Sequence, residues 1–194
     1  VQTGDILDNC RPFDKKCDEP QENDSEYYDL DVPEDIKLYE LFTELDKKAR
    51  KHNSQVISLF GNHELLNISG NLNYVSYSDV MKFATDENQS YEQAKQNRID
   101  QFKPGNKYAI DMACTRIPVV IIGNFLFVHA GIVKPFLNKL NINNREDLYK
   151  VSYLVRQWLL NLIQKDDMIN IINMAPYSLF WTRTLSAISN NAKI

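Results

Sequence analysis

Three short strand-like segments in this sequence each run directly into a glycine and a set of polar side chains. The segments are residues 1–3, 56–60 and 125–128, and β-branched and aromatic residues dominate the last two. They continue into Gly4-Asp5-x-x-Asp8, Gly61-Asn62-His63-Glu64 and His129-Ala130-Gly131. Strands that end in this way are typical of an α/β sheet with a ligand site at the ends of its strands. This pattern limits the fold more than any other feature of the chain.

A helical pattern separates the first two segments. From Asp35 to Ala49 the apolar residues recur at helical spacing, and a basic cluster lies near the end of this stretch. Strand, helix and strand form a βαβ unit, in which the carboxyl ends of the parallel strands lie side by side. We therefore expect Asp5 and His63 to meet at one edge of a sheet.

Two further stretches are predicted to be helical. Residues 70–115 are mostly polar, contain Ser90 and Gln93 in capping-box spacing, and predict a helical subdomain. Residues 145–163 carry a wide apolar face that is typical of a helix packed on a core.

A β-hairpin is predicted just before His129. Residues 117–122 and 125–128 are apolar and flank Gly123-Asn124, a dipeptide that suits a two-residue hairpin turn. The second strand of this hairpin ends at His129, so the imidazole should join the same sheet edge.

Length and charge narrow the class of protein. The 194 residues predict one domain over 1–194, and the ten acidic residues of 14–35 predict a solvated loop insert. A formal charge of −4 gives no reason to expect nucleic acid as a partner. The longest apolar stretch, 117–128, is interrupted and too short to span a bilayer, so no membrane segment is predicted. The oligomeric state is left open.

The cysteines favour a reducing compartment, with the cytoplasm as the expected location. Cys10, Cys17 and Cys114 are odd in number and have no C-x-x-C spacing, which predicts free thiols. A bridge between Cys10 and Cys17 is the alternative.

The polar residues at the strand ends are suited to binding a metal. Carboxylate, amide carbonyl and imidazole groups are ligands for Mn, Fe or Zn. Taken singly, His63 could be an ordinary residue of a helix N-terminus and His129 a hydrogen-bonded core histidine. Their occurrence in order, each after a strand, favours a metal site. The third histidine, His52, lies at a helix end, where the helix dipole explains it.

These motifs together resemble those of the calcineurin-like metallophosphoesterases. GNHE at residues 61–64 and HAG at 129–131 match two blocks of the phosphoprotein-phosphatase superfamily, and the Asp5–Asp8 segment matches part of a third. The run GNHELLNISGNLNYV is most similar to Shewanella-like protein phosphatases, as is the Trp-x-Arg segment at 181–183. The resemblance implies an α/β fold, a layered metallophosphoesterase β-sandwich flanked by helices. The activity that it implies is that of a metal-dependent phosphomonoester hydrolase.

The resemblance also implies a two-metal site. Asp5 would bridge two divalent ions, and Asn62 and His129 would bind the second of them. The ions would be Mn, Fe or Zn, with Mn expected to serve in vitro. Asn62 would also contact the substrate. Two such ions activate a water for in-line attack and neutralise charge on the phosphoryl oxygens.

The remaining implied roles concern the proton and the phosphate. His63 would be the general acid and Asp8 would hydrogen-bond it. Arg183 would bind the phosphate. The family arginine of the Asp-Arg-Gly block is replaced here by Asn9, and Arg11 is the nearest guanidinium that could substitute for it.

Two family elements are absent from the sequence. No GDxHG block precedes Val1 and no histidine follows His129, so the chain resembles a catalytic domain that is incomplete at both ends and is expected to be nearly inactive alone. The substrate would be a phosphorylated protein (serine, threonine or tyrosine) or a small phosphoester. A dinucleoside tetraphosphate hydrolase and a non-catalytic pseudophosphatase that acts as a binding module are the alternatives.

Overall fold

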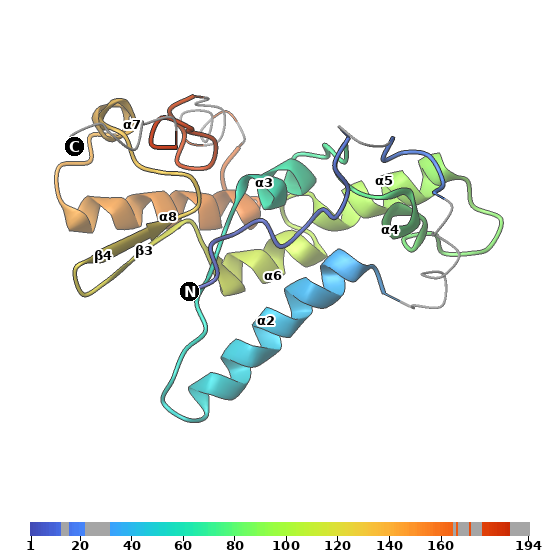
Figure 1. Ribbon diagram of the computed structural model, residues 1–194, viewed down its shortest axis with the longest axis horizontal. Coiled ribbons are helices and arrows are strands. Elements are labelled where there is room, and N and C mark those ends of the chain that lie inside the picture. The colour runs from blue at the N-terminus through green and yellow to red at the C-terminus, as the bar shows by residue number, and fades with distance from the viewer. Residues whose placement is uncertain (13–15, 22–31, 165, 167–170, 172–175, 187–194) are drawn as a thin grey trace.

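The structure, a computed structural model, describes residues 1–12, 16–21, 32–164, 166, 171 and 176–186. These residues form a mixed α/β arrangement of helices with small sheets (Figure 1). The strands are β1 (Ser58–Leu59), β2 (Arg116–Ile117), β3 (Val119–Ile122) and β4 (Phe125–Val128). The helices are α2 (Glu34–Arg50), α3 (Asn62–Ile68), α4 (Tyr77–Met81), α5 (Tyr91–Phe102), α6 (Lys107–Thr115), α7 (Lys134–Lys139) and α8 (Arg145–Leu159).

The predicted parallel pairing of the first two strand segments is confirmed. Gln2 forms a parallel bridge to Ser58, and β1 pairs in parallel with β2 through Ser58 with Arg116 and Leu59 with Ile117. Helix α2 connects the first two segments, as the βαβ pattern requires. The chain therefore leaves the first segment and β1 in the same direction, and the residues after them lie side by side.

The predicted hairpin is also confirmed. β3 and β4 pair antiparallel from Val119 with Val128 to Ile122 with Phe125, and Gly123 in the turn has a φ of +60°. Among the described residues each of the two sheets has two strands. The layered β-sandwich therefore stays a prediction.

The helices frame the strand ends. Figure 1 shows α8 and the β3–β4 hairpin at one end of the molecule, α4 and α5 at the other, and α3 between them. Helix α3 begins directly after the β1 strand end, so the first turn of α3 carries the side chains of the predicted site. One hydrophobic core joins these elements. Within it, Phe60 and Phe180 meet edge to face and Phe102 stacks on Tyr108.

The helical predictions differ from the structure mainly at their ends. Helix α2 begins after Pro33, close to its predicted start. Ser90 and Gln93 form the capping box expected at the start of α5. Of the acidic segment 14–35, residues 16–21 and 32–35 are described, and the rest lies outside the described residues.

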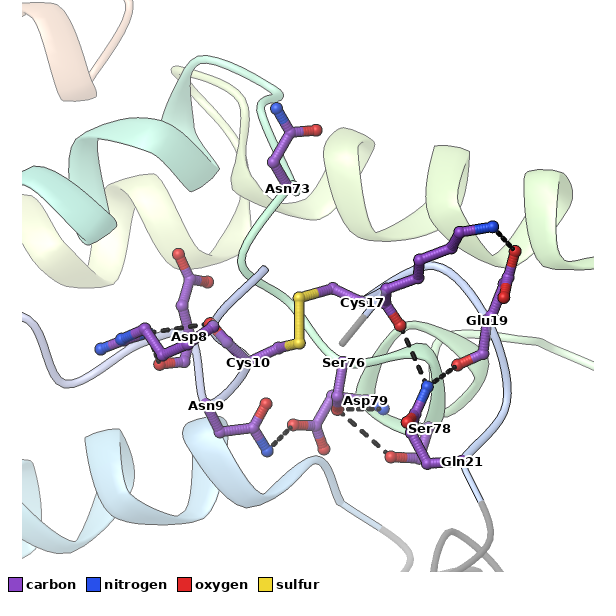
Figure 2. Close-up of a disulfide and its surroundings, with 12 residues drawn as sticks. Asp8, Asn9, Cys10, Cys17, Glu19, Gln21, Asn73, Ser76, Ser78 and Asp79 are labelled. Atoms are coloured by element: carbon purple, nitrogen blue, oxygen red, sulfur yellow. Dashed lines mark hydrogen bonds and ion pairs between the residues drawn. A yellow bond between two sulfur atoms is a disulfide. The ribbon is translucent and has the colours of Figure 1, made fainter. Parts of the chain in front are cut away.

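The prediction of three free thiols is wrong. Cys10 and Cys17 form a disulfide, with their Cα atoms 5.8 Å apart, while Cys114 is a free and exposed thiol. Figure 2 shows this bridge closing the short loop that begins two residues after Asp8. Counting cysteines missed it because disulfide formation depends on the distance and direction of the two side chains, which a count does not report.

None of the helices among the described residues combines the length and the apolar character that a bilayer crossing requires.

Candidate active site

Two glycines allow the strand ends to approach closely. A Cβ atom on Gly4, which has a φ of +92°, would lie 2.8 Å from the Gly61 nitrogen and 3.0 Å from His129 Nδ1. A Cβ atom on Gly61 would lie 2.3 Å from Asp5 Oδ1. Because real Cβ atoms do not approach other atoms this closely, only glycine fits at either position. The close contact brings all three predicted motifs together.

The loop between the two acidic residues has an unusual backbone. Asp5 and Asp8 have φ angles of +59° and +73°, in the left-handed region that residues with a Cβ atom seldom adopt. Such conformations persist where the surrounding contacts enforce them, and they are concentrated at functional sites.

Glu64 supplies those contacts. Its carboxylate, which is buried, accepts hydrogen bonds from the amides of Asp5 (2.9 Å), Ile6 (2.8 Å), Leu7 (3.1 Å) and Gly61 (2.7 Å). Burial raises the pKa of Glu64 above its ordinary value, and the amides of Asp5, Leu7 and Gly61 oppose this rise. Glu64 therefore holds the backbone of the loop after Gly4 against the start of α3.

The predicted proximity of Asp5, Asn62 and His129 is confirmed. His129 Nε2 lies 2.8 Å from Asn62 Oδ1 and 3.2 Å from Asp5 Oδ2. The other Asp5 oxygen accepts the backbone amide of His63 at 3.0 Å. Burial alone would raise the pKa of Asp5, but the hydrogen bonds from His129 and from the His63 amide outweigh burial and lower it.

The His129 ring is fixed at its other nitrogen. Nδ1 lies 2.8 Å from the carbonyl oxygen of Thr3, which can only accept, so Nδ1 carries a proton. Nε2 then faces two acceptor oxygens, and a proton or another cation is needed among the three atoms. Burial alone would lower the pKa of His129, but the hydrogen bond and charge of Asp5 raise it above the ordinary value.

Asp5 Oδ2, Asn62 Oδ1 and His129 Nε2 are atoms of the kinds that bind metal ions, but three ligands are fewer than a metal ion usually takes. Carboxylate, amide oxygen and imidazole nitrogen suit a hard or borderline cation, which takes about four to six ligands. Across the described part of the chain, no group of three or more His, Cys, Asp or Glu side chains is arranged to hold a metal ion. Asp5 and His129 supply two such side chains here, and Asn62 adds an amide.

The predicted contact between Asp8 and His63 is confirmed. His63 Nδ1 lies 2.7 Å from Asp8 Oδ2, and His63 Nε2 lies 3.9 Å from Asp5 Oδ2. The ring of Tyr74 packs edge to face on the imidazole, with centroids 4.9 Å apart. His63 is thus held at one nitrogen by Asp8 and packed against Tyr74, with its second nitrogen toward Asp5.

One of the curated relatives of this chain is named as a protein phosphatase. The chain is 37% identical to an uncharacterized protein, R398, of Acanthamoeba polyphaga mimivirus over 79% of this chain and 64% of that protein. It is 33% identical to Shewanella-like protein phosphatase 1 of Plasmodium berghei (strain Anka), over 55% of this chain and 27% of that protein. It is 36% identical to an uncharacterized protein, C1840.07c, of Schizosaccharomyces pombe over 51% of this chain and 21% of that protein.

The chain thus spans less than two thirds of the length of each of these relatives. No protein-family model and no solved structure matches it.

The side chains of Asn9 and Arg11 form their hydrogen bonds away from Asp5, Asn62 and His129. Asn9 Nδ2 donates to Asp79 Oδ2 at 2.7 Å, as Figure 2 shows. Arg11 is exposed and donates to the carbonyl oxygens of Asp8 (3.2 Å) and Cys10 (3.0 Å). The Arg11 guanidinium is therefore close to the Asp8 backbone but is engaged locally.

Arg183 lies on a segment that contacts the third strand end. The amide of Ala130 donates to Leu179 O at 3.0 Å, which brings this segment beside the HAG motif. The guanidinium of Arg183 is exposed and donates to the carbonyl oxygens of Trp181 and Thr182, both at 3.2 Å. The structure thus brings the Arg183 backbone near the site, while the side chain makes these hydrogen bonds within its own turn.

Sequence reasoning missed a second set of polar residues behind Asp8. Asn67 donates to Asp8 Oδ1 at 2.7 Å, and Arg98 donates to Asn67 Oδ1. Two signals were present: Asn67 follows His63 by one helical turn, and Arg98 occupies the apolar face of its helix. An arginine on a buried face needs polar partners, but the sequence does not name them.

Proposed function

We propose that this site hydrolyses phosphomonoesters with the help of divalent metal ions, in the manner of a protein phosphatase. The observation that carries the proposal is the convergence of Asp5, Asn62 and His129 beside the His63–Asp8 pair. The name of the Plasmodium relative, a Shewanella-like protein phosphatase, supports the same reaction class. The layered metallophosphoesterase fold is part of this proposal.

Metal ions would be held by Asp5, Asn62 and His129, with Mn²⁺ serving in vitro. When bound, such ions activate water and neutralise the charge that develops on the phosphoryl group. Asn62 would also face the substrate. Arg11 and Arg183 are proposed to bind phosphate oxygens, which requires each to exchange its local carbonyl contacts for the anion. Charge-assisted bonds to phosphate are stronger than bonds to a neutral carbonyl, so this exchange is favourable.

His63 would supply the proton for the leaving group. Its Nδ1–H is donated to Asp8 Oδ2 at 2.7 Å, so the proton available for transfer is carried by Nε2. The Asp8 carboxylate holds the ring with Nε2 directed toward Asp5. Tyr74 packs edge to face with the ring and limits its rotation.

The test combines metal binding with turnover. Mn²⁺ binding to the 194-residue chain is measured by calorimetry, and hydrolysis of phenyl phosphate is measured in the full-length protein. Asp5→Asn and His129→Gln should each abolish both, while His52→Gln, a histidine change at the end of α2, should leave both unchanged. Unaltered Mn²⁺ binding in Asp5→Asn and His129→Gln, or turnover that resists a chelator, would contradict the metal site.

The general-acid role is tested by leaving-group dependence. His63→Asn should lower turnover of alkyl phosphates by roughly 10²–10⁴-fold and that of phenyl phosphates far less, because phenoxide leaves without full protonation. Equal losses for both substrates would assign His63 to binding or structure instead.

One observation favours a non-catalytic binding module as the second candidate. Asn9, at the position of the family arginine, donates to Asp79 and offers no guanidinium to a phosphate. A pseudophosphatase would bind Mn²⁺ and a phosphorylated ligand but release no phosphate. Calorimetry with inorganic phosphate, run beside the turnover assay, separates the two functions.

A further inference from the structure

A buried polar chain runs from the His63–Asp8 pair to helix α5. Asp8 Oδ1 accepts Asn67 Nδ2 at 2.7 Å. Asn67 Oδ1 accepts Arg98 Nε at 3.1 Å and Arg98 Nη2 at 2.9 Å. Arg98 Nη2 also donates to Asp35 Oδ2 at 2.5 Å. The side chains of Asp8 and Arg98 are fully buried and that of Asp35 is 1% exposed, so little water competes for these bonds.

Arg98 determines which way the Asn67 amide faces. A guanidinium only donates hydrogen bonds, so the Asn67 atom that meets it must be the oxygen. The Asn67 NH₂ group then points the other way, toward Asp8 Oδ1 and the carbonyl oxygen of His63, 3.0 Å away. A reversed amide would place an NH₂ group against Arg98 and an oxygen against a carboxylate, and both contacts are unfavourable.

The amide orientation in turn fixes the His63 ring. With Oδ1 occupied by Asn67, the Asp8 carboxylate presents Oδ2 to the imidazole, and a carboxylate can only accept. His63 Nδ1 must therefore carry a proton, and Nε2 is the nitrogen directed toward Asp5. The chain of contacts keeps the Nδ1 proton toward Asp8 and leaves Nε2 as the nitrogen that would carry the proton a general acid transfers.

The direct ion-pair partner of Arg98 is Asp35 and not Asp8. Asp35, in the first turn of α2, forms the closest ion pair with Arg98, and the rings of Phe83 and Phe102 lie about the guanidinium with centroids 5.1 and 5.0 Å away. Because Asp35 pairs with the arginine, Asp8 remains free to pair with His63. Arg98 also holds α2, α3 and α5 together, so a test must separate positioning from simple stabilisation.

We propose that Asn67 and Arg98 are positioning residues that set the tautomer and orientation of His63, an inference that rests on the proposed general-acid function of that histidine. The helical region between the GNHE and HAG motifs thereby controls the proton donor through one buried arginine. Neither residue touches the substrate.

The test compares two matched substitutions. Asn67→Leu removes the amide without changing side-chain size greatly. Asn97→Leu makes the same change one residue from Arg98 on α5, where the amide donates to Phe83 O and Gln89 Oε1. Arg98→Lys keeps the positive charge beside Asp35 but lacks the forked donors, and it replaces Asn67→Leu if that variant does not fold.

The first measurement is the ¹⁵N spectrum of the histidine rings in the 194-residue chain without metal, in alkaline buffer. The chain has three histidines, and a spectrum of His63→Asn identifies the His63 signals. We expect an Nδ1–H signature for His63 in the wild type and in Asn97→Leu, and a mixture of tautomers in Asn67→Leu. An unchanged Nδ1–H signature in Asn67→Leu or Arg98→Lys would overturn the inference.

The second measurement is turnover of alkyl and phenyl phosphates by the full-length protein. Asn67→Leu should lower alkyl phosphate turnover about 10-fold or more, with a smaller loss for phenyl phosphate, and Asn97→Leu should leave the ratio unchanged. Equal ratios in the two leucine variants would overturn the positioning role. If wild-type protein shows the expected tautomer but no turnover, the proposed function fails while the control of His63 by Asn67 and Arg98 stands.

Discussion

At the scale of single residues, Gly61 is the position in the site with the least space for a side chain. Its φ of −107° is accessible to any residue, so the requirement for glycine there is purely one of space. We predict that Gly61→Ala lowers the free energy of unfolding by about 1–3 kcal/mol, because the new Cβ atom must displace Asp5 Oδ1 from 2.3 Å. Denaturant unfolding measures the loss of stability. Mn²⁺ affinity, measured by calorimetry, should also fall, because the displaced Asp5 is a proposed metal ligand.

Gly123→Ala is the control for this change. Gly123 has a φ of +60° and no atom within 4 Å of its added Cβ, so alanine there introduces backbone strain without a clash. Its Mn²⁺ affinity should equal that of the wild type. A Gly61→Ala protein with unchanged stability and Mn²⁺ affinity would show that Asp5 can move without cost.

A second residue prediction concerns pH. Burial, and then the negative charge of Asp35, raise the pKa of Asp79 above its ordinary value of 3.8. The unfolded chain therefore ionises this group more readily than the folded chain, and folding loses stability as pH rises from 3.8 through the raised value. Asp79→Asn, whose amide oxygen can still accept the Glu34 amide, should gain stability relative to wild type over that range. Unfolding curves in which this gap stays constant or narrows with rising pH contradict the assignment.

The sequence predicted direct contacts in the site better than supporting ones. The resemblance to the phosphatase blocks implied the contact of Asp8 with His63, and the order of the strand ends predicted the meeting of Asp5 with His129. The contact from Arg98 through Asn67 could not be predicted, because it joins a helix to a loop across 90 positions of sequence and depends on side-chain packing. The Cys10–Cys17 bridge was misjudged for the same reason, since its formation depends on local geometry.

At the scale of elements, helix ends show where periodicity misleads. The apolar pattern of α8 continues to residue 163, but the helix ends at Leu159. Asn161 adopts a φ of +58°, its amide donates to Trp158 O, and the amide of Leu162 donates to Gln157 O. These bonds form a Schellman motif, in which an asparagine takes the left-handed position that often falls to glycine. Beyond it, Ile163 packs against the core, whereas Leu162 is exposed.

The start of α5 gives a prediction at this scale. The Ser90 hydroxyl caps the helix by accepting from the Gln93 amide, and Gln93 Oε1 accepts from the Ser90 amide at 2.8 Å. Ser90→Ala should reduce stability by about 1 kcal/mol, measured by thermal unfolding. Ser90→Asp restores an accepting oxygen and should remain near the wild type. Equal losses in both variants would show that the cap contributes little to α5.

At the scale of the whole molecule, the site is assembled from distant parts of the chain. Thr3 orients His129 across 126 positions, and Asn62 contacts His129 across 67. Three strand segments and the turn of residues 178–182 must therefore be in place before the polar side chains meet. Motif order predicted the meeting of the first two strand ends, because those strands are parallel. The expectation that His129 joins the same sheet edge is wrong for the described residues, since β4 pairs antiparallel with β3 in a separate sheet, although the imidazole still reaches Asp5. The extent of the sheet was not predictable from the same motifs.

The disulfide contributes to the stability of this assembly. Cys10 and Cys17 are seven positions apart, Cys10 is fully buried, and the Cys10 amide donates to Tyr74 O at 3.0 Å. The bridge thus closes the loop after Asp8, and the Cys10 amide ties that loop to Tyr74, whose ring packs on His63. Its removal should affect the whole folding equilibrium, since the bridge restricts the unfolded chain as well as the folded one.

We predict that Cys10→Ser combined with Cys17→Ser lowers the free energy of unfolding by about 2–3 kcal/mol, the loop-closure entropy of so short a ring. Denaturant unfolding of the wild type with and without a reducing agent should show a loss of similar size, while the double variant should not respond to the reducing agent. Cys114→Ser, which removes an exposed free thiol, serves as the matched control and should unfold as the wild type does. If reduction leaves the wild-type unfolding curve unchanged, the loop from residue 10 to residue 17 is held by its packing against Tyr74 and not by the bond between its sulfur atoms.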